Sequence, residues 1–297
     1  MFLSDDFIYV DLNKTGSVSV INWLKKLGVP LIECHHHLKP STEQIESDKI
    51  KFATIRDPWS YYHSLWSYGC KKKRQSGPYN SLTKFSPFRH RGFSNNRWGA
   101  LKSVGLCFFR GLSEDWSQNK HFYSDAEDPK LFQSWIRKLL DSKTSVFLSG
   151  SYYSSGIQNF CGLYTYRFCN LYCKTNDKLH SGKIRNLPTL KSWTENNLYI
   201  DEFLNTGSLR EDFVALIQNY NLVDDSVDLS CVSSTRMNAS KSSSVDLADF
   251  YDDVAIELVA MKEKLIIDRF NFDFEDSTQL QKPVAKTANL QFSRNSI

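Results

Sequence analysis

Two adjoining segments, Phe7-Ile-Tyr-Val-Asp-Leu12 and Asn13-Lys-Thr-Gly-Ser-Val-Ser19, join an apolar run to a polar loop that contains glycine. The apolar run is short and bounded by polar residues, which is typical of a buried strand. From Val20 to Leu27 the apolar residues recur at helical spacing, so Ser17 is expected to cap a helix and Gly28 to end it in a left-handed conformation. The segments therefore predict a strand, a loop and a helix in succession.

The same order of elements recurs further along the chain. Val29-Pro-Leu-Ile-Glu-Cys34 is predicted to be a strand, and so is Lys51-Phe-Ala-Thr-Ile55. Pro58 then stands where the first turn of a helix tolerates proline. Repeated strand–loop–helix units build parallel α/β sheets. The fold class we expect is α/β: a single P-loop-like domain with a central parallel sheet flanked by helices and interrupted by loop insertions.

The remaining segments are predicted from their periodicity and composition. We expect a long, basic loop region over 70–110, helices over 130–140, 209–220 and 250–270, and short strands over 146–148 and 198–200. Beyond Asp276 the chain is polar and has no period. We therefore expect one domain over 1–276 and a flexible tail over 277–297.

Composition limits the class of protein. The chain has 297 residues, of which 41% are hydrophobic, so it is long enough to bury a substantial core. Its formal net charge of +4 is too small to predict nucleic-acid binding, but it is compatible with a local anion site. The seven cysteines contain no Cys-x-x-Cys pair, so we expect free thiols in a cytoplasmic, reducing setting. No run of about 18 apolar residues occurs, so no membrane span is predicted.

Lys14-Thr-Gly-Ser-Val-Ser19 is the first candidate anion site. Gly16 lets backbone approach a phosphate closely, and the N–H groups at the start of the following helix favour an anion. Lys14, Ser17 and Ser19 add further donors. The spacing is not that of a Walker A motif, and a capped turn without a ligand is the alternative interpretation.

Arg56-Asp-Pro-Trp-Ser-Tyr-Tyr-His-Ser64 is the second candidate site, and it again follows a predicted strand and enters a helix. The planar guanidinium of Arg56 suits a phosphate, and Ser64 is placed to offer a hydroxyl to the same group. The ends of parallel strands meet along one edge of a sheet, where such folds bind ligands. The two sites therefore favour a ligand with phosphates at both ends.

These two motifs resemble those of sulfotransferases that use 3′-phosphoadenosine-5′-phosphosulfate (PAPS), particularly carbohydrate-type and short bacterial members. Lys14 through Ser19 is similar to their K-T-G-S-T-S loop, and Arg56 through Ser64 is similar to their R-D-P element with a serine eight residues after the arginine. Weaker similarity extends to about Phe274. Val18 departs from the pattern, because threonine is usual there and a hydroxyl is lost.

The resemblance implies an enzyme that transfers a sulfuryl group from PAPS to a hydroxyl or amine, leaving adenosine 3′,5′-bisphosphate (PAP). It assigns cofactor binding to two motifs and one late segment, and these residues are Lys14, Thr15, Gly16, Ser17, Val18, Ser19, Arg56, Ser64, Arg236 and Asn238. Lys14 is also expected to stabilise the leaving phosphate. The implied acceptor is a small molecule or a glycan, and segments 69–124 and 149–190 are expected to form its pocket. No metal is expected.

The catalytic base is expected among His35-His-His37, because the family uses a histidine or a glutamate and this triplet directly follows a predicted strand. If that strand alternates, His35 and His37 share one face and His36 points away. We prefer His37, with His35 as the alternative, and a merely solvated triplet remains open. A metal site at the triplet is disfavoured, because three consecutive residues do not easily coordinate one ion. A kinase of the P-loop class and a catalytically silent nucleotide- or glycan-binding protein are the competing functions.

Overall fold

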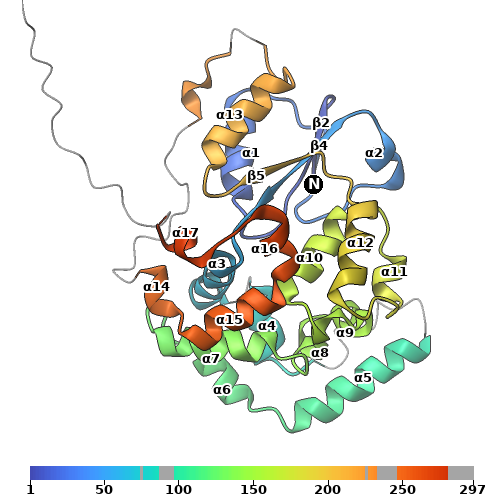
Figure 1. The fold of residues 1–297 in the computed structure, drawn as a ribbon, viewed down its shortest axis with the longest axis vertical. Coiled ribbons are helices and arrows are strands. Elements are labelled where there is room, and N and C mark those ends of the chain that lie inside the picture. The colour runs from blue at the N-terminus through green and yellow to red at the C-terminus, as the bar shows by residue number, and fades with distance from the viewer. Residues whose placement is uncertain (74–75, 87–96, 225–226, 233–245, 280–297) are drawn as a thin grey trace, which may run out of the picture.

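The computed structural model describes residues 1–73, 76–86, 97–224, 227–232 and 246–279. The predicted cofactor residues Arg236 and Asn238 lie outside this part of the chain, as does most of the predicted tail. The expected α/β class is confirmed, with helices on both sides of a five-stranded sheet (Figure 1).

The sheet has the strand order β3-β1-β2-β4-β5, with bounds β1 (Phe2–Leu3), β2 (Phe7–Val10), β3 (Glu33–Cys34), β4 (Ile50–Ile55) and β5 (Glu202–Asn205). Strands β2, β4 and β5 run parallel, with Val10 opposite Ala53 and Ala53 opposite Phe203. Strand β1 is antiparallel to both of its neighbours. The sheet is therefore mixed rather than wholly parallel, because the chain enters β2 through a tight reversal from β1.

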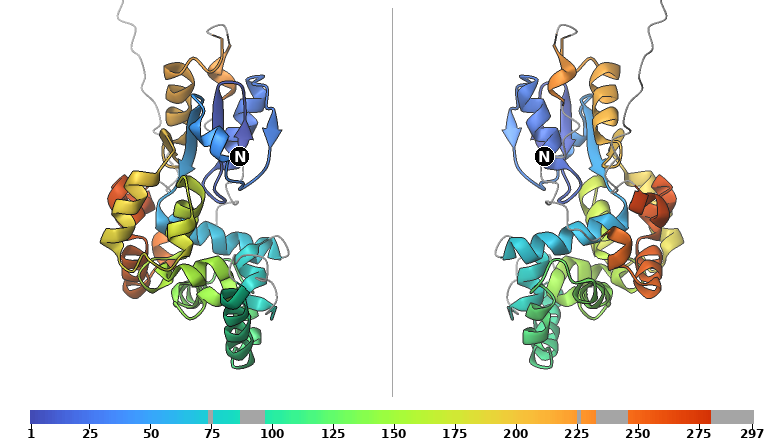
Figure 2. Two further views of the ribbon diagram at one scale, coloured as in Figure 1. Left: turned by 90° about the vertical axis from the view of Figure 1, so that its right-hand side faces the viewer. Right: turned by 90° about the vertical axis from the view of Figure 1, so that its left-hand side faces the viewer.

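The alternation of side chains along β2 and β4 builds two separate cores. Tyr9 and Phe52 stack on each other on the face that α1 (Ser17–Lys26) and α13 (Leu209–Asn219) cover. Ile8 and Ala53 face the opposite side and join a larger core. Figure 2 shows the helices of this larger core gathered beneath the sheet.

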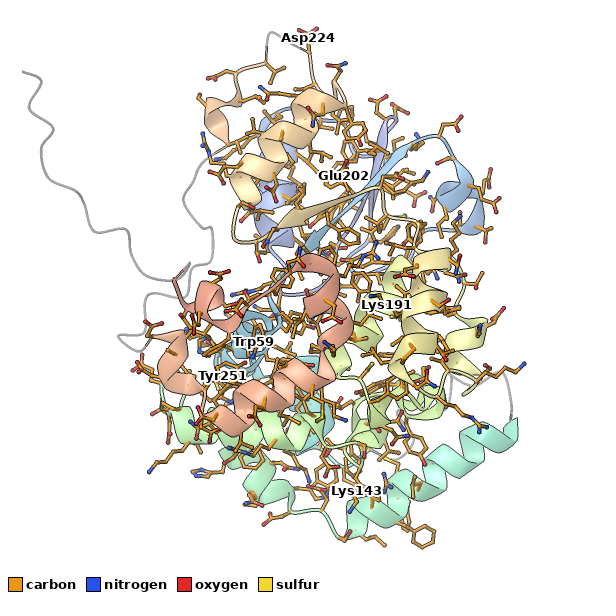
Figure 3. All side chains as sticks on the ribbon, in the orientation of Figure 1. Trp59, Lys143, Lys191, Glu202, Asp224 and Tyr251 are labelled. Atoms are coloured by element: carbon orange, nitrogen blue, oxygen red, sulfur yellow. The ribbon has the colours of Figure 1, made fainter. Side chains whose placement is uncertain are left out.

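Most of the remaining helices contribute to the larger core, whereas the buried residues of α5 and α8 form a third, small cluster. The bounds are α2 (Thr42–Glu46), α3 (Pro58–Lys71), α4 (Gly77–Thr83), α5 (Arg97–Leu112), α6 (Trp116–His121), α7 (Pro129–Leu140), α8 (Ser145–Leu148), α9 (Gly150–Ser155), α10 (Leu163–Tyr172), α11 (Asp177–His180), α12 (Leu187–Asn197), α14 (Leu247–Phe250), α15 (Asp253–Lys262), α16 (Lys264–Phe270) and α17 (Phe274–Gln279). Tyr251 lies beside Trp59 and donates to its carbonyl oxygen at 2.8 Å (Figure 3).

Several predicted elements are wrong. The apolar run 146–148 is part of the one-turn helix α8, since three apolar residues do not distinguish a strand from a buried helix. Segment 70–110 contains α4 and α5 and is not a continuous loop. Leu198 forms only an isolated bridge with Cys173, and β5 begins four residues later. Gly16, not Ser17, is the N-cap of α1.

The predicted helix over 250–270 is divided at Glu263, which ends α15 and precedes α16. The Glu263 side chain is fully buried and caps the start of α10, where its carboxylate accepts from the N–H of Thr165 at 2.8 Å and of Tyr164 at 3.3 Å. The hydroxyls of Thr165 and Tyr62 also donate to it. Burial raises the pKa of Glu263 to about 7, although these hydrogen bonds act to lower it. One carboxylate thus joins α3, α10 and the α15–α16 junction.

Gly162 leaves no room for a side chain beside this carboxylate. A Cβ at position 162 would lie 1.9 Å from Oε1 of Glu263 and 2.8 Å from the Tyr62 hydroxyl oxygen. Gly162→Ala is therefore expected to lower the free energy of unfolding by about 3 kcal/mol, the upper range for overpacking. Chemical denaturation measures this loss.

Gly105→Ala is the matched control, because a Cβ there meets nothing within 4 Å and the residue lies inside α5. Alanine is the better helix former by up to about 1 kcal/mol, so this variant should be as stable as the parent or more so. Equal stability of the two variants would show that Glu263 and Tyr62 adjust freely.

Candidate anion-binding site

The loop between β2 and α1 has the backbone of an anion cradle. Lys14 and Gly16 both adopt left-handed conformations, with φ of 69° and 95°. Glycine accepts this conformation readily, whereas for lysine it is uncommon and strained. The loop ends at the N-terminus of α1, a ten-residue helix whose first N–H groups have no partner within the helix. Backbone N–H groups and the helix dipole therefore point towards the same end of β2.

Thr15 holds this loop against the sheet. Its side chain is fully buried, and its hydroxyl lies 2.7 Å from the carbonyl oxygen of Leu12 and 2.7 Å from Oγ1 of Thr54 on β4. Tyr9 hydrogen-bonds to the same Thr54 hydroxyl at 3.1 Å. The hydroxyl of Thr15 thus serves the loop itself, and only the backbone N–H of this residue suits contact with an anion. Val18 is exposed, whereas Ser17 is buried.

Arg56 follows β4 directly and lies against the loop. Its Nη1 donates to the carbonyl oxygen of Lys14 at 3.2 Å, and its Nε donates to Oγ of Ser60 at 2.7 Å. Its backbone N–H donates to the Tyr164 hydroxyl at 3.0 Å, and this hydroxyl donates to the Arg56 carbonyl oxygen at 2.9 Å. The two predicted motifs therefore meet at one edge of the sheet.

One face of α3 continues the site. Ser60, Ser64, Tyr68 and Lys71 are separated by four, four and three residues, so they form a stripe along the helix. Ser60 binds Arg56, and the Tyr68 ring lies 4.3 Å from Nζ of Lys14. Ser64 stands between them and is half-buried. The stripe places the Ser64 hydroxyl on the side of α3 that faces the loop.

Positive charge accumulates at this edge. Burial lowers the pKa of Lys14, the charges of Arg56 and Lys71 lower it in the same direction, and together they bring it to about 8. Within the described residues, none of the ion pairs includes Lys14, Lys71 or Arg167. A bound anion would relieve the repulsion among these cations.

Arg167 on α10 brings a further cation to the loop. Its Nη1 donates to Oδ1 of Asn13 at 3.2 Å and to the Tyr61 hydroxyl at 2.9 Å. The Tyr61 ring stacks on Tyr164 with centroids 3.8 Å apart, and Tyr164 in turn holds the backbone of Arg56. The stacked tyrosines thus connect the guanidinium of Arg167 to that of Arg56.

The histidines do not alternate as predicted. Strand β3 ends at Cys34, and left-handed His37, with φ of 56°, turns the chain. His36 and His37 both contact Asp11, with Nδ1 of each ring at 2.9 and 3.3 Å from Oδ2. His35 is exposed and pairs through its backbone N–H with the Met1 carbonyl oxygen. His37 therefore contacts Asp11, which precedes Lys14 by three residues, and its side chain is 47% exposed.

Sequence reasoning missed several residues of this site. Tyr68 and Lys71 extend the Arg56–Ser64 motif at helical spacing, so the period of α3 was a usable signal. Asp11 gives no such signal, because its role depends on a turn at His37 that the pattern does not reveal. Arg167 reaches the loop from a helix more than 150 residues further along the chain.

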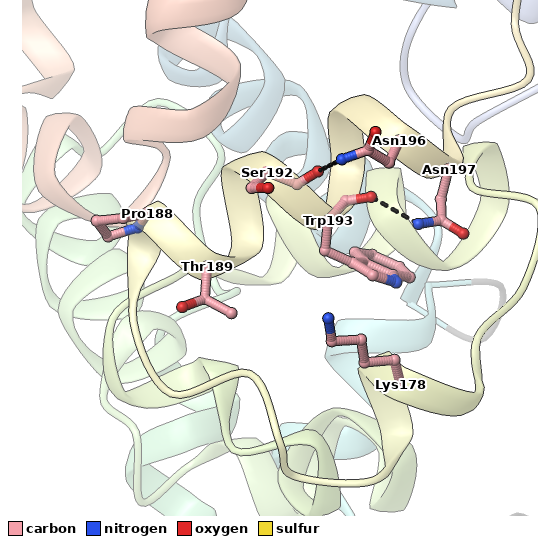
Figure 4. A pocket seen from close by; sticks show the side chains of 7 residues that line it. All are labelled: Lys178, Pro188, Thr189, Ser192, Trp193, Asn196 and Asn197. Carbon is pink, nitrogen blue, oxygen red and sulfur yellow. Dashed lines mark hydrogen bonds between the residues drawn. The ribbon is translucent and has the colours of Figure 1, made fainter.

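A hollow of about 450 Å³ lies elsewhere, between α11 and α12 (Figure 4). Lys178 points across it towards Trp193, and the remaining lining residues belong to α12. Asn196 and Asn197 donate to the carbonyl oxygens of Ser192 and Trp193 within that helix. None of the predicted site residues lines the hollow, although it overlaps the segment 149–190 that is expected to form the acceptor pocket.

Among the residues that the structure describes, no helix is both long and apolar enough to cross a membrane. Comparison of the chain with protein-family models, with curated proteins and with solved structures gives no match. The chemistry of the site is therefore inferred from its own residues.

Proposed function

We propose that the protein is a PAPS-dependent sulfotransferase with a P-loop-like nucleotide site, which transfers a sulfuryl group to a hydroxyl or amine of a small-molecule or carbohydrate acceptor. One observation carries the proposal: the loop of Lys14 and the guanidinium of Arg56 are in direct contact at the ends of two parallel strands. Both motifs of the family resemblance thus contribute to one site.

The positions of the loop and of Arg56 suggest which part of the ligand each of them binds. The loop N–H groups and Lys14 face the end of β2, where they suit the 5′-phosphosulfate. Arg56 and the Ser64 side of α3 suit the 3′-phosphate, since a guanidinium fork binds phosphate oxygens in pairs. A ligand with phosphate at both ends engages all of these groups at once. A single phosphate engages only part of them.

Sulfuryl transfer requires charge stabilisation at one oxygen and proton removal at another. The sulfuryl group passes in line from the phosphate oxygen to the acceptor, and negative charge develops on the leaving phosphate. The Lys14 ammonium stabilises that charge. His37 accepts the proton of the acceptor hydroxyl through Nε2, while Asp11 holds Nδ1 on the opposite side of the ring.

PAP is expected to bind tightly in excess EDTA, and ATP is expected to bind at least about tenfold more weakly. Lys14, Arg56 and the loop N–H groups supply the positive potential, so no divalent metal is needed. Calorimetric titrations of both nucleotides, with and without chelator, measure this preference. Loss of PAP binding on chelation, together with tight ATP binding in Mg²⁺, would favour the kinase alternative instead.

PAP affinity is expected to fall as the pH rises through about 8, because the unliganded Lys14 ammonium loses its proton there. The limit for one linked proton is about tenfold per pH unit. Lys14→Arg keeps its charge throughout, so its affinity should stay nearly constant over the same range. Titrations between about pH 7 and pH 10 compare the two proteins. A similar slope in both would assign the titration to another group.

A further inference from the structure

Asp11 is a buried carboxylate at the end of β2 whose two oxygens have different partners. Oδ1 accepts from the Met1 amino nitrogen and from the backbone N–H of His37, both at 2.9 Å. Oδ2 faces outward to the histidine rings. The Asp11 side chain is fully buried, so its position is set by the strand and by these backbone contacts. A fixed carboxylate oxygen thereby lies directly beneath the two exposed histidine rings.

Two imidazole nitrogens converge on that oxygen. Nδ1 of His36 lies 2.9 Å and Nδ1 of His37 lies 3.3 Å from Oδ2 of Asp11, and the three ligand atoms lie within 4.8 Å of one another. Adjacent side chains of an extended segment point to opposite faces. The left-handed conformation of His37 removes that divergence and brings both rings to one side. The rings of His36 and Phe2 also pack edge to face.

We propose that Asp11, His36 and His37 bind one divalent transition-metal ion, with Zn²⁺ as the best fit. Two imidazole nitrogens and one carboxylate oxygen are ligands that Zn²⁺ prefers, at about 2.0–2.2 Å in a tetrahedral arrangement. Three donors leave the fourth position to water or to another ligand. Mg²⁺ and Ca²⁺ are disfavoured, because they prefer sites made of oxygen atoms.

Two of the three donors are open to solvent. The side chains of His36 and His37 are 60% and 47% exposed, whereas Asp11 is fully buried beneath them, so an ion reaches the carboxylate between the two rings. A metal ion at this position takes the place of the hydrogen bonds between the two Nδ1 atoms and Asp11. It also takes His37 away from its role as a base, so Zn²⁺ would inhibit transfer. The predicted inhibition rests on the proposed function, whereas the binding of Zn²⁺ does not.

Calorimetric titration of the metal-free full-length protein with ZnCl₂, without nucleotide, tests the proposal. We expect one ion per chain and an affinity at least about tenfold lower in His36→Gln, which removes a ligand that has no part in the proposed transfer. His35→Gln is the matched control, since this neighbour does not contact Asp11 with its ring, and it should bind Zn²⁺ as the parent does. Co²⁺ should give the intense visible absorption of a tetrahedral site.

Cys34→Ser provides a second control, because this exposed thiol is close in sequence and zinc also binds thiolates. Unchanged affinity in His36→Gln, or an equal loss in His35→Gln or Cys34→Ser, would overturn the assigned ligands, and no binding at about 100 µM would overturn the site. Thermal melting confirms that each variant is folded. PAP titration of the same samples shows separately whether the nucleotide site is present.

Discussion

Replacing His37 by asparagine is expected to lower the turnover of sulfuryl transfer by roughly 10²- to 10⁴-fold, the usual contribution of a general base. PAP affinity should change by less than about twofold, because His37 lies on the Asp11 side of the loop and not on the Arg56 side. Asparagine is chosen because it tolerates the left-handed backbone at this position, where φ is 56°. Turnover is measured with labelled PAPS and affinity by calorimetry, both in chelator.

Two controls accompany this variant. Lys14→Ala should lower both affinity and turnover, because we propose that the ammonium binds the nucleotide and also stabilises the leaving phosphate. His35→Ala should retain turnover, since its ring does not contact Asp11. If His35→Ala loses turnover while His37→Asn keeps it, the base is His35 and the proposed reaction is unaffected.

Arg56→Ala is expected to weaken PAP binding by about 2–5 kcal/mol, the cost of removing one partner of a close charge-assisted contact. That corresponds to a loss of roughly 30- to 5,000-fold in affinity. Arg185→Ala, which removes an exposed arginine from the segment before α12, should change affinity less than about threefold. Titration calorimetry compares the two.

Arg56→Lys separates the charge of this residue from its shape. It keeps the positive charge but loses the planar fork that reaches Ser60 and the Lys14 carbonyl oxygen, so an intermediate affinity is expected. Because Arg56 also holds the loop, the melting temperature of each variant is compared with that of the parent. Equally small effects from Arg56→Ala and Arg185→Ala would place the 3′-phosphate elsewhere.

The central part of the fold follows from local sequence patterns. β2, α1, β4 and α3 were predicted because their apolar residues keep a clear period and their boundaries carry glycine, proline or polar residues. The meeting of Lys14 and Arg56 was also predictable, since the ends of neighbouring parallel strands share one edge. Both predictions depend on interactions within about 50 residues.

Several elements that the sequence predicted wrongly depend on contacts with residues far away in the sequence. The helix over 250–270 divides because Glu263 turns inward to cap α10, about 100 residues away. Nothing in the period of that helix reveals the break. The grouping of His36 with His37 likewise depends on a single left-handed residue and on Asp11. Helix α4 forms in a segment rich in glycine, proline and polar residues, and α5 contains three glycines, so neither has the composition of a typical helix.

The most direct test of the proposed function is the transfer of a labelled sulfuryl group from PAPS to a panel of glycans, lipids and small alcohols or amines. We predict labelled product from at least one acceptor, release of one PAP for each group transferred, and no product from Lys14→Ala. A protein that binds PAP tightly, yet labels no acceptor and releases no PAP across the panel, would contradict the account and identify a catalytically silent nucleotide-binding protein.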